Sequence, residues 1–209
     1  MTRPGPRRPR RRAPADRRAP AAARRPPQPH RQAGLGGDQV EGRRAVLELL
    51  RAGRREVKRV FVAANVEHDD ALDEIVERAG ARLQVVPPQR LEQLAGTDAP
   101  QGVVARAAPL RESDLDGLLA RDDAFLVALD GVTDPGNLGA IARVAETAGA
   151  TGLVVARHRS ARLTPAVTKA AAGAIEYLAI ATVGGIPAAL DRAQRVGRVD
   201  GGARRARRP

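Results

Sequence analysis

The chain has 209 residues, with 36 Lys and Arg against 24 Asp and Glu, and contains no cysteine. This length is enough for one or two domains with substantial cores. The lack of cysteine excludes disulfides and thiolate metal sites and favours a reducing, cytoplasmic compartment. Three scattered histidines, His30, His68 and His158, predict no metal site. No apolar run approaches the roughly 20 residues that span a membrane, and the first residues have no secretory pattern.

The formal charge of +12 is concentrated at the two ends of the chain. Residues 1–35 carry eleven Arg and one Asp, and residues 202–209 carry four Arg and no acid, which leaves a net charge of −2 for the body. Residues 1–38 are low-complexity sequence and predict a disordered basic tail. Two interpretations of the tails stay open. They bind phosphate backbones without reading sequence, or they are solvated arms of an arginine-rich chain.

Residues 39–108 alternate helical and strand patterns, which predicts a small α/β domain. The expected elements are a helix through Val46, Leu49 and Leu50 that stops at Gly53, a strand over Val57–Ala63, a helix over Leu72–Ala79 capped by Gly80, a strand over Leu83–Val86, a short helix over Leu91–Leu94 and a strand over Gly102–Ala105.

Residues 109–123 are polar and predict a linker with a helical turn at Leu115–Leu119. A second α/β unit is expected over residues 124–197. Its predicted elements are a strand over Ala124–Leu129, a helix over Leu138–Ala148, a strand over Gly152–Ala156, a helix from Pro165 to Ala172 with Thr164 as N-cap, a strand over Tyr177–Val183 and a helix over Pro187–Arg195. Residues 198–209 are rich in Gly and Arg and cannot form a buried strand, so we expect a basic irregular tail and a second domain that lacks its last strands.

The segment Asp130–Arg143 follows an apolar strand directly and contains a Pro135-Gly136 turn. A helix opening at Asn137 presents Gly139 and Arg143 on one face, four residues apart. Open α/β sheets bind ligands at the carboxyl ends of their strands, so this segment is a candidate site. Two structural interpretations compete with it, in which Asn137 is only an N-cap and Arg143 only forms a surface pair with Glu146.

The same segment resembles the first signature of the SpoU (TrmH-like) RNA 2′-O-ribose methyltransferases of the SPOUT superfamily. Its N-x-G-x-x-x-R core is matched by Asn137, Gly139 and Arg143, flanked by Asp130-Gly131 and Ala148-Gly149-Ala150. Lys169, Ala172-Gly173-Ala174 and Glu176 are similar to a later segment of the family. Val40–Leu50 and Gln101–Val104 look like its L30e-like substrate-binding domain. The resemblance covers residues 39–195.

The resemblance implies an α/β fold, in which an L30e-like domain precedes an incomplete α/β-knot domain with a Rossmann-like parallel sheet. It implies an S-adenosylmethionine-dependent RNA 2′-O-ribose methyltransferase that acts on 23S ribosomal RNA and forms a homodimer, without a membrane or a metal. Arg143 and Asn137 are then the catalytic residues. Gly139, Lys169, Glu176, Arg157 and Arg159 are the expected RNA- and ribose-binding residues.

Two later signatures of the family are missing from this sequence, a glycine-rich loop and a Ser-Leu-Asn-Val-Ser segment that together hold the cofactor in the knot. The cofactor-binding residues are therefore unknown, and little methyl transfer by these 209 residues is expected. The alternative function is a non-catalytic RNA-binding fragment. A nucleotide-binding Rossmann domain is disfavoured, because the turn after the strand at 124–129 lacks the G-x-G-x-x-G pattern.

Overall fold

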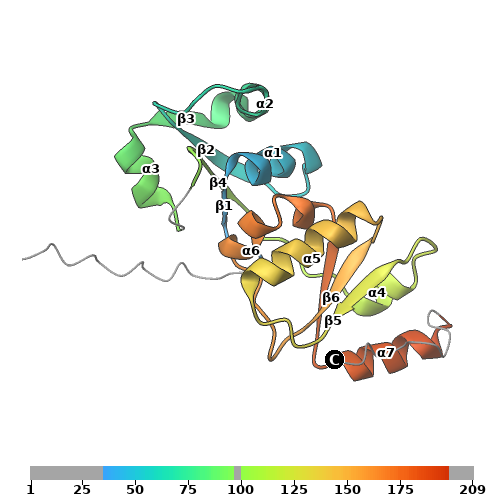
Figure 1. Cartoon of the computed structure of the whole chain (residues 1–209). Helices are drawn as coiled ribbons and strands as arrows, with labels where there is room; N and C mark the ends of the chain where they lie inside the picture. The colour runs from blue at the N-terminus through green and yellow to red at the C-terminus, as the bar shows by residue number, and fades with distance from the viewer. Residues whose placement is uncertain (1–34, 97–99, 198–209) are drawn as a thin grey trace, which may run out of the picture.

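The computed structural model describes residues 35–96 and 100–197, which form two α/β domains (Figure 1). The expected basic tails lie outside the described residues, apart from residues 35–38. The first domain holds a four-stranded sheet in the order β1-β4-β2-β3. Its strands are β1 (Gln39–Glu41), β2 (Val57–Ala63), β3 (Leu83–Val86) and β4 (Val103–Ala107). β2 and β3 are parallel, whereas β4 is antiparallel to both β1 and β2, so this sheet is mixed.

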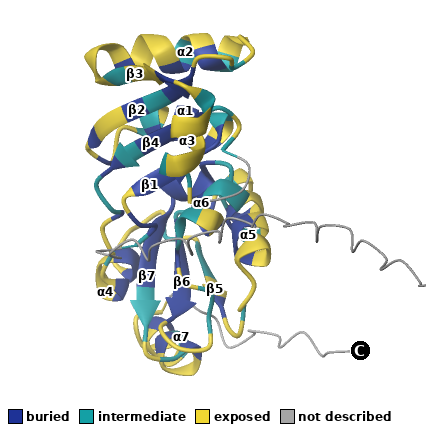
Figure 2. Ribbon diagram, turned by 90° about the vertical axis from the view of Figure 1, so that its left-hand side faces the viewer, coloured by how far each residue is buried: buried dark blue, intermediate teal, exposed yellow. Residues whose placement is uncertain are grey.

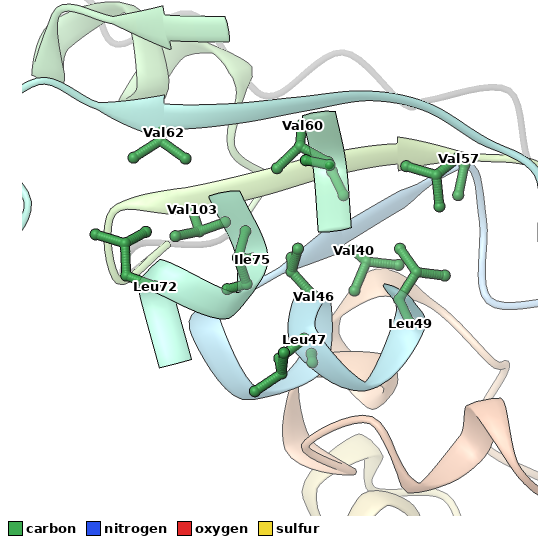
Figure 3. Packing of buried hydrophobic residues seen from close by; sticks show 14 residues of the cluster. Val40, Val46, Leu47, Leu49, Val57, Val60, Val62, Leu72, Ile75 and Val103 are labelled. Atoms are coloured by element: carbon green, nitrogen blue, oxygen red, sulfur yellow. The ribbon is translucent and has the colours of Figure 1, made fainter. Parts of the chain in front are cut away.

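Helices lie on both faces of the first sheet. They are α1 (Arg43–Ala52), α2 (Asp70–Ala79) with the short 3-10 turn η1 (Gly80–Arg82), and α3 (Pro88–Leu94). α1 and α2 pack on one face around aliphatic residues that include Val46, Leu72 and Val103 (Figure 3). α3 packs on the other face, where Leu91 meets Val104. Neighbouring residues of one strand point to opposite faces, which is why Val103 and Val104 belong to different cores.

The second domain holds three parallel strands in the order β5-β6-β7. Its elements are α4 (Leu115–Leu119), β5 (Leu126–Leu129), α5 (Pro135–Thr147), β6 (Gly152–Ala156), α6 (Pro165–Ala170), the 3-10 turn η2 (Ala174–Glu176), β7 (Ala179–Val183) and α7 (Ile186–Arg195). α5, α6 and η2 share one core with the sheet, and α4 and α7 share another, so the sheet lies between two helical layers, with β6 buried throughout (Figure 2). The expected α/β class with a parallel sheet is confirmed.

The two domains touch over a continuous junction. β1 lies beside α6, and α1 lies beside η2 (Figure 1). Leu35 forms an isolated antiparallel bridge with Leu110, and the N–H of Gly36 donates a 2.9 Å hydrogen bond to the carbonyl of Leu163. The segment before β1 therefore contacts the second domain and links the first domain to it.

The main differences from the predicted elements lie at helix and strand ends. β1 was not predicted as a strand, because three residues are too few to show a period. The helix expected to reach Ala172 ends at Ala170, and the strand expected from Tyr177 begins at Ala179, shortly after η2. The helical turn expected at Leu115–Leu119 is present as α4, and its three leucines are buried against the sheet. No helix in the described part of the chain is long and apolar enough to cross a membrane.

Candidate active site

Helix α5 begins just after the carboxyl end of β5, and an aspartate fixes its first turn. Asp134 is the N-cap, and its carboxylate accepts a 2.7 Å hydrogen bond from the backbone N–H of Asn137. Pro135 occupies the first helical position, where its missing N–H has no partner to lose. Asn137 is thus the third helical residue, and the interpretation of Asn137 as the N-cap is wrong. An aspartate directly before a proline is a helix-start signal from which Asp134 could have been found.

The side chains of Asn137 and Arg143 are exposed on α5. Within residues 35–96 and 100–197, neither side chain has a hydrogen-bond or ion-pair partner, and the surface pair with Glu146, the competing structural interpretation of Arg143, is not formed. Six helical positions at about 100° each place the two side chains about 120° apart around the helix axis. They do not converge on one point, so a ligand that contacts both must lie along the first turns of α5.

Gly139 has a different role from the one expected. A Cβ added at this position would lie 2.5 Å from the Cβ of Ala170 and 2.7 Å from the backbone N of Ala171. The space beside Gly139 is thus filled by the backbone of α6, and Gly139 is buried. Gly139 was expected to bind RNA or ribose, but in this structure its missing side chain lets two helices approach closely.

The later expected residues are separated by the fold. Lys169 lies in the last turn of α6 and is half-buried. Glu176 has no exposed surface, and its Oε1 accepts a 3.0 Å charge-assisted hydrogen bond from Nη1 of Arg55 in the first domain. Burial raises the pKa of the Glu176 carboxyl, against the lowering effect of Arg55. In this conformation Glu176 is not available to RNA, and it belongs to the domain junction.

The β6–α6 loop carries Arg157 and Arg159, which are both exposed. The N–H of Ala161 in this loop donates a 2.7 Å hydrogen bond to the carbonyl of Val132, which holds the loop beside the turn that precedes α5. A cavity of about 210 Å³ opens at the carboxyl ends of β6 and β7, lined in part by Arg157 and Thr182. The Oγ1 of Thr182 is buried and has no hydrogen-bond partner among the described residues. Thr182 was not among the predicted site residues, although its place near the end of a parallel strand is a usable signal.

A larger cavity of about 880 Å³ lies in the first domain, between α1, α2 and the turn before β4. Arg43, Arg44 and Arg51 line it together with four carboxylates, and Arg43 pairs with Asp69 at 2.6 Å. Its charge is therefore mixed. Among the described residues, no group of three or more His, Asp or Glu side chains is placed to hold a metal ion.

Comparison with known families assigns both domains. Residues 39–113 match the family described as "RNA 2'-O ribose methyltransferase substrate binding", and residues 124–203 match the family described as "SpoU rRNA Methylase family". The chain belongs to the SpoU family. The first match covers the mixed sheet and its helices, and the second covers the parallel sheet with the α5 segment.

Named relatives of this SpoU chain are bacterial. It is 35% identical over 161 residues to a "Putative TrmH family tRNA/rRNA methyltransferase" of Bacillus subtilis, covering 74% of this chain and 64% of the relative. It is 37% identical to a "23S rRNA (guanosine-2'-O-)-methyltransferase" of Pseudomonas syringae, covering 77% of this chain and 66% of that protein. The chain thus spans about two thirds or less of the length of these relatives.

Solved structures agree with the fold of this SpoU chain. An AdoMet-bound rRNA methyltransferase from Sinorhizobium meliloti is 26% identical, with a TM-score of 0.55 over 75% of this chain and 57% of that one. The SpoU methyltransferase AviRb from Streptomyces viridochromogenes has a TM-score of 0.60 at 24% identity, over 78% of this chain and 59% of that one, and shows the fold alone.

Proposed function

We propose that this SpoU chain binds ribosomal RNA and places a ribose 2′-hydroxyl for methylation, as part of an S-adenosylmethionine-dependent RNA 2′-O-ribose methyltransferase. The observation that carries the proposal is the exposed amide of Asn137 and the unpaired guanidinium of Arg143, on the helix that follows β5. The printed name of the Pseudomonas syringae relative, a guanosine 2′-O-methyltransferase of 23S rRNA, supports this reaction.

Arg143 and Asn137 would act by positioning. A guanidinium stays protonated in proteins and presents forked donors that match a phosphate, so Arg143 is suited to hold the phosphate beside the target ribose. The carboxamide of Asn137 has both donors and an acceptor, and would orient the sugar hydroxyls. Holding the reacting hydroxyl in the correct position provides a large part of the rate enhancement in such a transfer.

Further RNA contacts are proposed on both sides of these residues. Arg157 and Arg159 are exposed in the loop fastened beside the turn before α5, where they would meet phosphates of the same strand. Lys169 on α6 remains a proposed contact. The large cavity of the first domain, with Arg44 exposed at its edge, would receive a more distant part of the RNA.

S-adenosylmethionine, when bound, supplies the methyl group. Two cavities at the carboxyl end of β7 are lined in part by Arg157 and Thr182, and their volumes are about 210 Å³ and about 630 Å³. The larger one lies within the usual range of ligand sites, roughly 300–1,000 Å³. Residues that line it, Thr182 and Gly184 among them, would hold the cofactor, and we assign no step to it. The divergence of Asn137 and Arg143 around the axis of α5 favours a second candidate function, a non-catalytic RNA-binding protein.

Methyl transfer to 23S rRNA and binding of the same RNA test the proposal together. The enzyme function predicts transfer by the unaltered chain, and Arg143→Ala should reduce it about 100-fold or more while RNA affinity stays nearly unchanged. Arg195→Ala, which removes an exposed arginine from α7, is the matched control and should leave transfer intact. RNA binding without transfer by the unaltered chain would favour the second candidate. Absence of RNA binding would contradict both.

A homodimer is part of the proposal. Val144 is 70% exposed on α5, next to Arg143, and a second copy would cover this apolar surface. Light scattering should give twice the mass of one chain. A single-chain mass at high concentration would contradict this part of the proposal alone.

A further inference from the structure

The domain junction holds a buried ion pair that has no place in the proposed chemistry. Arg55 lies in the turn between α1 and β2, and its side chain is 1% exposed. Glu176 lies in η2 and is fully buried. We infer that the Arg55–Glu176 pair fixes the orientation of the two domains, and thereby fixes the position of RNA held by the first domain relative to Arg143. The claim about the position of the RNA rests on the proposed function, whereas the claim about domain orientation rests on the junction alone.

Arg55 uses three of its nitrogen atoms to tie separate segments together. Nη1 donates to Glu176 Oε1 at 3.0 Å, Nε donates to the carbonyl of Ala108 at 2.5 Å, and Nη2 donates to the carbonyl of Gly37 at 2.8 Å. These acceptors come from η2, from the segment after β4 and from the segment before β1. A planar fork with fixed donor directions can satisfy three such acceptors in only one arrangement of the segments.

Glu176 indicates that the pair is an orienting device rather than a source of stability. Its second oxygen, Oε2, is buried without a hydrogen-bond partner in the described part of the chain. A carboxylate with one unsatisfied oxygen carries a large desolvation cost, and apolar replacements of buried ion pairs are often neutral or stabilising. An apolar pair cannot fix the relative orientation of the two domains, because hydrophobic contact is not directional.

The surroundings of the pair connect it to both candidate RNA surfaces. A Cβ at Gly173 would lie 2.3 Å from the Cβ of Glu48, so α1 and the loop before η2 approach as closely as a glycine allows. The hydroxyl of Tyr177 donates a 2.7 Å hydrogen bond to Glu48 Oε2 at the edge of this contact. α1 lines the large cavity of the first domain, and η2 packs against α5, which carries Arg143. A continuous series of packed elements therefore connects the cavity, through α1 and η2, to α5.

Interdomain distances measured by pulsed electron spin resonance test the inference without RNA or cofactor. The chain has no cysteine, so two introduced cysteines give a doubly spin-labelled protein without background. Val76→Cys on α2 and Phe125→Cys directly before β5 report the interdomain distance, since these side chains are 37% and 49% exposed. Val76→Cys with Val85→Cys, which is 61% exposed on β3, reports a distance inside the first domain and serves as the control.

The double variant Arg55→Met with Glu176→Leu removes the charges and keeps an apolar volume. We expect the single narrow interdomain peak of the unaltered chain to be lost, while the peak inside the first domain is kept. Arg54→Ala, which removes only a 3.1 Å hydrogen bond to the carbonyl of Glu176, should keep both peaks.

A narrow interdomain peak in the double variant would overturn the inference. If that variant also lost the control peak and so failed to fold, the same distances are measured in Arg55→Lys. A lysine keeps the charge but cannot reach three acceptors at once, so the interdomain peak should broaden, and an unchanged peak would overturn the inference. Because no RNA is present, absence of methyl transfer would leave this result untouched and would count against the proposed function alone.

Discussion

The two domains of this chain use their sheets differently. The first sheet is mixed, so its strand ends alternate between the two edges, and its polar cavity lies beside helices α1 and α2. The second sheet is all parallel, so the loops after β5, β6 and β7 meet at one edge. The parallel arrangement, rather than residue type alone, therefore brings Asn137 in the first turn of α5 and Arg157 after β6 to one end of the domain.

The largest effect is expected at the boundary between the two domains. Glu176→Ala leaves the guanidinium of Arg55 buried without its counter-charge, which costs about 3–5 kcal/mol. Thermal unfolding followed by calorimetry should then show two separate transitions, because each domain has its own core. A single transition at an unchanged temperature would show that the domains do not depend on this pair.

A smaller effect is expected inside the second domain. Gly139→Ala places a Cβ 2.5 Å from Ala170, and such overpacking costs about 1–3 kcal/mol in urea unfolding. Gly184→Ala is the matched control in the same domain, because no atom lies within 4 Å of its added Cβ. Equal unfolding midpoints for the two variants would contradict the close approach of α5 and α6.

Two aspartate N-caps, one in each domain, allow a direct comparison between the domains. Asp134→Ala removes the cap of α5 and should cost about 1 kcal/mol. Asp69→Ala removes the cap of α2 and also the ion pair with Arg43, so its effect should be the larger of the two. Urea unfolding of both variants measures this, and a larger loss for Asp134→Ala would contradict the ranking.

The smallest effect is the dependence of the free energy of unfolding on pH, and this dependence has opposite signs in the two domains. The hydrogen bond from Arg51, with a second from Arg78, lowers the pKa of Glu74 to about 2 from 4.5. The stability that Glu74 contributes is thus present above pH 4.5 and lost as the pH falls toward 2. Burial raises the pKa of Glu176, so the folded state holds this proton more tightly and stability falls as the pH rises above 4.5.

Urea midpoints measured across acidic pH values should separate these two effects. Glu74→Gln should reduce the loss of stability at low pH, to which Asp69 and Asp123 also contribute, and Glu176→Gln should reduce the fall of stability above pH 4.5. If both variants kept the pH profile of the unaltered chain, neither carboxylate would be the titrating group.

Local patterns determined most of the elements of this protein. The β-branched run over Val57–Ala63 and the apolar spacing of Leu72 and Ile75 predict their strand and helix because burial selects the period of apolar residues. The N-x-G-x-x-x-R core around Asn137 indicates the family only together with its flanking residues and the upstream segments that resemble the substrate-binding domain. The domain boundaries and the roles of the site residues stay predictions.

The tertiary structure alone decided how individual residues are used. The motif predicts that Gly139 contacts RNA or ribose, yet α6 fills the space beside it. Glu176 reads as a site residue, yet Arg55, 121 positions away, pairs with it in the buried junction. No local pattern contains such information, because burial and partners depend on which distant segments pack together. The sequence determines which groups are present, and packing determines whether each group meets solvent, a neighbouring helix or a counter-charge.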